Sequence, residues 1–243
     1  MKFYDAHAHF VGQEAGGFLV GLEGEPWFEE NSPAFCVPGK ILHNDEAEEL
    51  AKKGMYRVFR YVRNEEVEGC ELNVEGCGLN VGTCLKYHPR REKYSPEEVI
   101  ESIRKLKPRA VMIDTLNEPG WVAYDYWKVA RAFPELPVFL PHAGGYLIND
   151  FIKICHFQKN VWIDFTLTHT NFGGISKNPL AYVDDAIRYA LNGPFKDRVL
   201  MGSDLPFFDQ MKVVEYYERL GAIEMLNENF ERAFDILQTR SGL

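Results

Sequence analysis

Short runs of β-branched and aromatic residues alternate along the chain with longer segments that have helical periodicity. Each run is bounded by Gly, Pro or Asn, as expected of short strands. An example is 55–62, in which Tyr, Val and Phe interleave with Arg. The strands predicted in this way are 2–7, 55–62, 79–87, 109–114, 137–142, 161–166 and 198–203.

The helices predicted between these strands carry recognisable start signals. In the clearest case Ser95 is the N-cap, Pro96 occupies the first helical position, and Glu98 completes a capping box for a helix ending at Leu106. Strands that alternate with helices of 10 to 15 residues predict βαβ units and a parallel sheet. The other predicted helices are 44–53, 121–133, 146–157, 179–192, 209–219 and 222–238.

This order predicts an α/β fold of the (β/α) TIM-barrel type. Seven strands are recognisable where a complete barrel has eight, so a distorted, seven-stranded barrel is an alternative. The 243 residues suit one large domain, and because no linker interrupts the pattern we predict a single domain over 1–243.

Two segments fall outside the alternation. Residues 11–43 are long and bear Gly and Pro, and we expect a βα loop over the mouth of the barrel, with Trp27, Phe28 and Phe35 in a hydrophobic lid or a packed surface loop. Residues 68–74 are nearly repeated in 75–81, which we interpret as a local duplication without chemical meaning.

Composition and charge narrow the functional classes. The chain is 46% hydrophobic and 26% charged, as in an ordinary soluble globular protein. A formal net charge of −9 argues against binding to nucleic acid or to an anionic membrane. No apolar run reaches the roughly 18 residues of a membrane span, and no signal peptide is recognisable at the start. The five cysteines are an odd number, typical of reduced thiols, so we expect a cytoplasmic protein.

The chemistry of the chain begins with His7 and His9, which lie two positions apart on the first predicted strand. Residues at this spacing point to the same side of a strand, and neutral imidazole is a common ligand of divalent metals. His142 and Asp204 each follow an apolar run, and the carboxyl ends of barrel strands meet at one mouth. Imidazoles and a carboxylate at one point are the components of a hydrolytic metal site, in which the pKa of water falls from about 15.7 to about 7.

Four motifs follow one another along the chain. They are Asp-Ala-His-Ala-His at 5–9, His-Ala-Gly-Gly at 142–145, Asn-Val-Trp-Ile-Asp at 160–164, and the segment 197–207 with Gly-Ser-Asp-Leu-Pro-Phe. With these motifs in this order, the chain resembles the amidohydrolase superfamily, and especially the branch called amidohydrolase family 2, which includes aminocarboxymuconate-semialdehyde decarboxylase. The resemblance spans the whole chain, including the closing helix at 223–237.

The resemblance implies roles for particular residues. His7, His9 and Asp204 are expected to bind a divalent metal, above all zinc, and Asp204 also to carry the proton of the attacking water. His142 corresponds to the catalytic histidine on strand six, and Asp5 to a hydrogen-bond acceptor behind the ligands. The implied reaction is metal-assisted cleavage of a C–N or C–O bond in a small carbonyl compound, or its decarboxylation. A homodimer is expected in this family.

One member of the expected ligand set has no obvious counterpart, namely a metal-binding histidine at the end of strand five. We expect that strand five is missing or degenerate. The alternative is that His142 fills its place, with 161–168 as strand six and His169 as its histidine. Replacement ligands are sought among His88, Asp114 and Glu118. His169 is also a candidate for substrate contact.

Basic residues on the predicted strands extend the set of candidates for substrate binding. Arg57, Arg60, Arg63 and Lys86 are candidates to meet an acidic substrate, or else are paired charges at the surface and the barrel ends.

Competing functions remain at this stage. A TatD-type metal-dependent nuclease or phosphoesterase also begins with His-x-His, but it expects Gly-Glu-x-Gly-Leu-Asp on its fourth strand, where this chain has Met112–Asn117. A PHP-type phosphoesterase would carry a histidine two positions after Asp204. A barrel that is metal-free, or that only binds its partner, is the remaining alternative.

Overall fold

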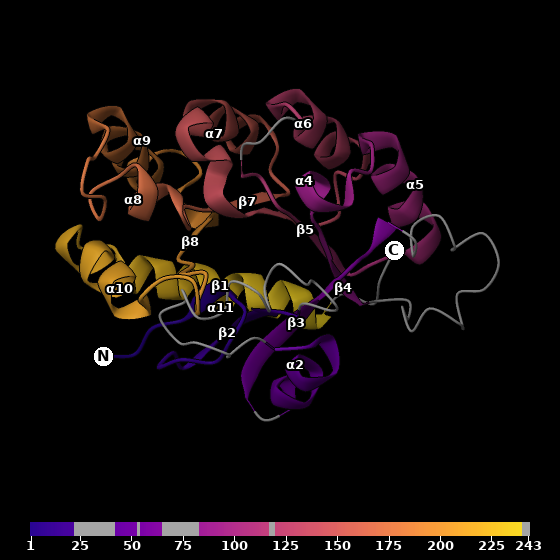
Figure 1. The fold of residues 1–243 in the computed structure, drawn as a ribbon, viewed down its shortest axis with the longest axis horizontal. Helices are drawn as coiled ribbons and strands as arrows, with labels where there is room; N and C mark the ends of the chain where they lie inside the picture. The colour runs from indigo at the N-terminus through magenta and orange to yellow at the C-terminus, as the bar shows by residue number, and fades with distance from the viewer. Residues whose placement is uncertain (22–41, 53, 65–82, 117–119, 240–243) are drawn as a thin grey trace.

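The computed structural model describes residues 1–21, 42–52, 54–64, 83–116 and 120–239. Eight parallel strands form one sheet in which every strand pairs with its neighbours in sequence (Figure 1). The strands are β1 (Asp5–Ala8), β2 (Gly16–Val20), β3 (Met55–Tyr61), β4 (Cys84–Tyr87), β5 (Ala110–Ile113), β6 (Val138–Leu140), β7 (Val161–Asp164) and β8 (Val199–Leu200).

Helices follow the strands and pack outside them, which confirms a (β/α) TIM barrel (Figure 1). The α-helices are α2 (Asn44–Ala51), α4 (Pro89–Glu92), α5 (Pro96–Leu106), α6 (Ala123–Ala132), α7 (Ile148–Phe157), α8 (Thr168–Asn171), α9 (Ala181–Asn192), α10 (Gln210–Arg219) and α11 (Ile223–Thr239). Two 3₁₀ segments are η2 (Pro141–Leu147) and η3 (Lys196–Arg198). The predicted capping box of α5 is present, with Glu98 N–H donating to Ser95 Oγ.

The barrel is nearly closed between β1 and the segment that follows β8. The backbone N–H of Ala6 donates to Met201 O at 2.7 Å, and that of Asp204 donates to His7 O at 2.8 Å. Asp5 reinforces this seam, because its carboxylate accepts bonds from the Ser203 N–H at 3.0 Å and from the Gln210 amide at 2.7 Å. Asp5 therefore acts as the expected hydrogen-bond acceptor.

The seven-stranded alternative was wrong, because β2 lies inside the segment 11–43 that was expected to be a loop. β2 is a five-residue strand that opens with two glycines. A Cβ on Gly16 would lie 2.3 Å from Met55 O, and one on Gly17 would lie 2.4 Å from Asp5 O, so the flanking strands approach too closely for any side chain. The predicted lid residues Trp27, Phe28 and Phe35, and the duplication at 68–81, lie outside the described residues.

The additional strand changes the count of all that follow. The segment 109–114 becomes β5, so strand five is present and Asp114 follows it directly. His142 comes after β6, as expected. The alternative that made 161–168 strand six was wrong, since Val161–Asp164 is β7. Only α6 separates β5 from β6 among the described residues, which explains the short interval that suggested a missing strand.

Aromatic side chains fill one end of the barrel. Phe18 packs against Phe59 with ring centroids 5.4 Å apart and against Phe139 at 5.3 Å. From α11, Phe230 stacks on Tyr4 at 4.6 Å and contacts Phe18 at 4.8 Å. These rings belong to one buried cluster, separate from the layer between sheet and helices. The polar residues therefore collect at the carboxyl ends of the strands, where a cavity remains.

Candidate active site

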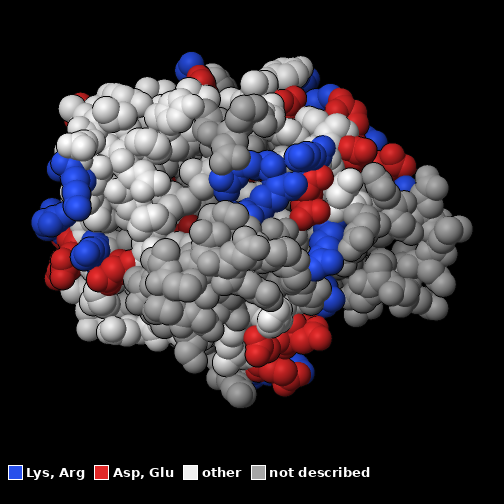
Figure 2. Space-filling model, viewed as in Figure 1, with Lys and Arg blue, Asp and Glu red and all other residues white. Residues whose placement is uncertain are grey.

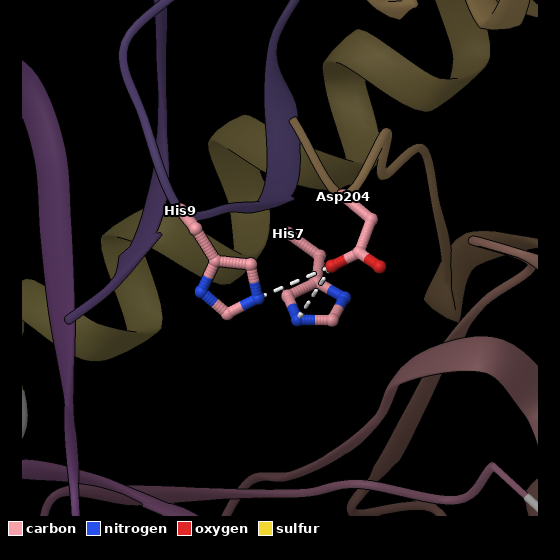
Figure 3. Close-up of side chains that lie close together, drawn as sticks. All are labelled: His7, His9 and Asp204. Atoms are coloured by element: carbon pink, nitrogen blue, oxygen red, sulfur yellow. Dashed lines mark ion pairs between the residues drawn. The ribbon is translucent and has the colours of Figure 1, made fainter. Parts of the chain in front are cut away.

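His7, His9 and Asp204 come together at the carboxyl ends of β1 and β8, as predicted (Figure 3). One ligand atom from each lies within 4.8 Å of the others, and all three side chains are buried. His9 Nε2 is 3.2 Å and His7 Nε2 is 3.7 Å from Asp204 Oδ1. The pairing of β1 with β2 shifts register between Asp5 and Ala8, an irregularity of the kind that re-aims side chains in a barrel.

The surroundings of His7 and His9 suit both imidazoles to metal binding. His9 Nδ1 donates to the carbonyl oxygen of Val20 at 3.0 Å, which leaves the lone pair on Nε2 directed at the cluster. Burial, aided by the nearby ammonium of Lys86, holds the pKa of His7 well below its ordinary value. His7 is therefore neutral at neutral pH, as a metal ligand must be.

Asp204 occupies an unusual backbone conformation. Its φ angle is +61°, a left-handed value that Asp tolerates better than most residues. Its N–H is fixed by His7 O, so the carboxylate is held against the two histidines. Two imidazoles and one carboxylate fit a divalent ion such as zinc, which typically has three protein ligands in catalytic sites.

His142 lies beside this cluster in a constrained turn. Its ring centroid is 5.0 Å from that of His7. The backbone has φ +68°, and its N–H donates to Asp164 Oδ1 at 3.2 Å. Gly144 completes the turn with φ +74°, and a Cβ there would lie 2.1 Å from the Phe151 ring. The His-Ala-Gly-Gly motif therefore fixes an imidazole at the mouth of the barrel.

Asp114 is the residue that the structure places at the strand-five position. Its carboxylate is buried and lies 2.9 Å from His142 Nε2 and 3.4 Å from His88 Nε2. Burial raises the pKa of Asp114, but His88, His142 and Lys86 outweigh it and hold the pKa well below the usual range. Asp114 is thus an ionised carboxylate, and it is not among the residues of the three-donor cluster.

A cavity of about 520 Å³ connects these groups. His7, His9 and Asp204 line it together with Asp114 and His142. Its remaining polar lining comes from the end of β4 and from α4, namely Lys86, His88, Arg90 and Arg91. Its apolar lining consists of Leu116, Leu167, Phe207 and Phe208.

The basic residues from β4 and α4 are the part of the site that sequence reasoning largely missed. Lys86 was considered only as one of several charges, although the sequence signal was present, since 86–91 reads Lys-Tyr-His-Pro-Arg-Arg across the end of a strand. Lys86 is 1% exposed, and its Nζ lies 3.5 Å from His7 Nε2. Because burial favours the neutral form, it lowers the pKa of Lys86.

Other predicted residues lie elsewhere. His169 is fully buried against the rings of Tyr216 and Tyr217, with centroids 5.7 Å away in both cases, and burial lowers its pKa to about 3. It does not line the described cavity, and its contact with substrate stays a prediction.

The remaining basic candidates are not part of the described cavity either. Arg57 stacks on Phe234, and Arg60 pairs with Glu48 at 3.2 Å. Neither these two nor Arg63 is among the residues that line the described cavity. Glu118 falls outside the described residues. Among the helices that the structure describes, none has the length and apolar character needed to cross a membrane.

Comparisons with known proteins agree with this architecture. An uncharacterised TIM-barrel protein from Bordetella bronchiseptica is 13% identical, with a TM-score of 0.66 over 99% of this chain and 100% of that one. A protein from Acinetobacter baumannii named probable 2-pyrone-4,6-dicarboxylic acid hydrolase is 13% identical, with a TM-score of 0.55 over 97% and 100%. An amidohydrolase 2 from Bifidobacterium longum subsp. infantis is 16% identical, with a TM-score of 0.55 over 97% and 99%.

These structural likenesses show the fold. No curated protein matched the sequence. The family model described as amidohydrolase matches residues 64–224, more than half of the chain, and nothing in the comparisons supports a TatD-type nuclease. The chain therefore belongs to the amidohydrolase family, as its motifs predicted.

Proposed function

We propose that this protein is a metal-dependent hydrolase that activates water to cleave a C–N or C–O bond in a small carbonyl compound bearing a carboxylate. One observation carries the proposal: the three-donor cluster of His7, His9 and Asp204 opens into the same cavity as His142. A cluster of ligands beside a fixed imidazole in a concave site is the arrangement expected of metal-assisted hydrolysis.

Each residue of the site has its own role in the proposed reaction. A divalent ion held by His7, His9 and Asp204 would supply Lewis-acid chemistry toward water and the substrate carbonyl. The second oxygen of the Asp204 carboxylate is suited to accept the proton of the attacking water. The His142 ring lines the same cavity and is held in place from several sides, which suits it to stabilise the oxygen on which negative charge develops.

The basic side of the cavity supports an anionic substrate. Lys86, Arg90 and Arg91 line the cavity, whereas its only carboxylates among the described residues are Asp114 and Asp204. Figure 2 shows Lys and Arg side chains gathered over α4, although the whole chain has a net charge of −9. Arginine suits the planar, two-oxygen geometry of a carboxylate. The A. baumannii neighbour is named for a dicarboxylic acid substrate, which agrees with this assignment.

Metal analysis is the first experiment. Wild-type protein purified without added metal is compared with His7→Ala and Asp204→Asn, and with His156→Ala as a matched control on an exposed histidine. We expect about one equivalent of a divalent metal in wild type and control, and its loss in both site variants. Metal-loaded protein is then screened against esters, lactones and amides that carry a carboxylate, with carbon dioxide release measured alongside.

A metal-independent hydrolase is a second candidate, and Lys86 favours it. The Lys86 ammonium lies 3.5 Å from His7 Nε2, which places a built-in cation beside the cluster. In this case wild type would hold no metal even after reconstitution, yet would still hydrolyse a member of the panel. Absence of both metal and turnover would overturn both candidates.

A further inference from the structure

Asp114 is a buried carboxylate to which the proposed reaction gives no task. It is 3% exposed, and both of its oxygens are engaged. Oδ1 accepts the backbone N–H of Leu116 at 3.2 Å and lies 3.9 Å from Arg90 Nε. Oδ2 lies 2.9 Å from His142 Nε2, 3.4 Å from His88 Nε2 and 4.0 Å from Lys86 Nζ. The shortest of these contacts is the one with the imidazole expected to act on substrate.

The two nitrogens of His142 show what this contact does. Nδ1 lies 3.1 Å from the carbonyl oxygen of Thr166, and because a carbonyl only accepts, Nδ1 must donate. Nε2 then faces the Asp114 carboxylate, a second acceptor, at 2.9 Å. Two acceptors at this distance would repel each other unless a proton lies between them. The contacts to Thr166 and Asp114 at the two nitrogens therefore fix the orientation of the ring.

The same contacts keep Asp114 from joining the metal ligands. It lies outside the cluster formed by His7, His9 and Asp204. The Lys86 ammonium is positioned between the two groups, 3.5 Å from His7 Nε2 and 4.0 Å from Asp114 Oδ2. Binding of a metal at the cluster by Asp114 Oδ2 would compete with its contacts to imidazole and ammonium. Its place at the strand-five position, where a ligand was expected, thus serves another purpose.

We infer that Asp114 is a positioning residue, which holds the His142 imidazole in one orientation, and that it is not a fourth metal ligand. The use of the His142 imidazole on substrate rests on the proposed function, whereas the Asp114–His142 pair does not depend on it.

The test is the Asp114→Asn variant, measured in two ways on the full chain. Long-range ¹H–¹⁵N NMR of histidine-labelled protein reports the protonation pattern of the His142 ring, with His142→Gln used to assign its signals. Metal content is measured on the same samples. Asp184→Asn is the matched control, since that carboxylate binds Tyr216 and Gly174 outside the cavity.

We expect Asp114→Asn to change the His142 ring signals and to keep the metal content of wild type, while the control changes neither. Asp114→Glu should restore the wild-type pattern at least in part, and it decides the question if the Asn variant does not fold. Unchanged His142 signals in Asp114→Asn would overturn the inference. Loss of metal from both Asp114→Asn and Asp114→Glu with unchanged His142 signals would also overturn it. If wild type holds no metal, the proposed function fails but the NMR comparison still decides the role of Asp114.

Once a substrate is found, kinetics can distinguish a positioning role of Asp114 from a role in substrate binding. A positioning role predicts that Asp114→Asn lowers kcat about 100-fold, the lower end of what general acid–base groups contribute, with KM within about threefold of wild type. A tenfold or larger rise in KM at unchanged kcat would instead assign Asp114 to substrate binding.

Discussion

The two sides of the cavity are built from opposite charge patterns. On the β1 and β8 side, two imidazoles and one carboxylate present ligand atoms to a common point. On the β4 to β6 side, basic groups and imidazoles surround the carboxylate of Asp114. The first pattern attracts a cation, and the second attracts an anion. We therefore expect the β1 and β8 side to activate water, and the β4 to β6 side to bind substrate and to position His142.

The difference between the two sides of the cavity predicts that His142 serves catalysis and not metal binding. The change His142→Gln removes the imidazole while keeping a polar side chain of similar reach. We expect turnover to fall by about 100-fold to 10,000-fold, the usual contribution of a general acid–base group, with metal content unchanged. Elemental analysis and kinetics on the same preparation check this. Loss of the metal would move His142 to the ligand side of the comparison.

A backbone change in β2 should disturb the ligand side through the barrel sheet. In Gly17→Ala the new Cβ would lie 2.4 Å from Asp5 O, which forces β2 away from β1 and disturbs the support that Val20 gives to His9. We expect a loss of about 2–4 kcal/mol in the free energy of unfolding, as for other severe backbone clashes. Gly54→Ala is the control, since its nearest contact would be 3.5 Å away. Urea titrations of both variants measure the difference.

Paired substitutions should damage the basic side alone. Arg90→Gln with Arg91→Gln removes two guanidinium groups that line the cavity. We expect a carboxylate probe such as malonate to bind about 10- to 100-fold more weakly, which is the effect of losing one charged hydrogen bond of about 1.5–3 kcal/mol. Calorimetry with malonate measures this, and Arg104→Gln with Arg131→Gln on exposed helix positions is the matched control. Equal weakening in both double variants would show only a loss of net positive charge.

His169 lies on neither side of the cavity, and its lowered pKa predicts that the stability of the protein depends on pH. Its pKa of about 3 in the folded protein lies below the ordinary value of 6.5, so the unfolded chain binds the proton more readily. The contribution of His169 to stability is therefore complete above about pH 6.5 and is lost progressively as the pH falls toward 3. At pH 5 the loss is about 2 kcal/mol. His169→Gln should show a shallower dependence in urea titrations at pH 7 and pH 5, and an identical slope would contradict the prediction.

The sequence was informative wherever the signal was local. Alternating strands and helices, the capping box at Ser95 and the spacing of His7 and His9 all depend on near neighbours in the chain, and the structure contains each of them. Asp204 could be added because the ends of parallel strands always meet at one mouth. These signals determined the barrel and the candidate metal cluster.

The tertiary structure decided what depends on contacts between distant segments. β2 is a strand because its two glycines fit between Asp5 and Met55, which no local pattern reveals. Recognising β2 moves Asp114 to strand five, where four side chains from other positions enclose its carboxylate. His169, a mouth residue by its sequence position, is buried under α10 for the same reason. A sequence states which groups a chain has, but the partners that set their charge and orientation are brought together only by folding.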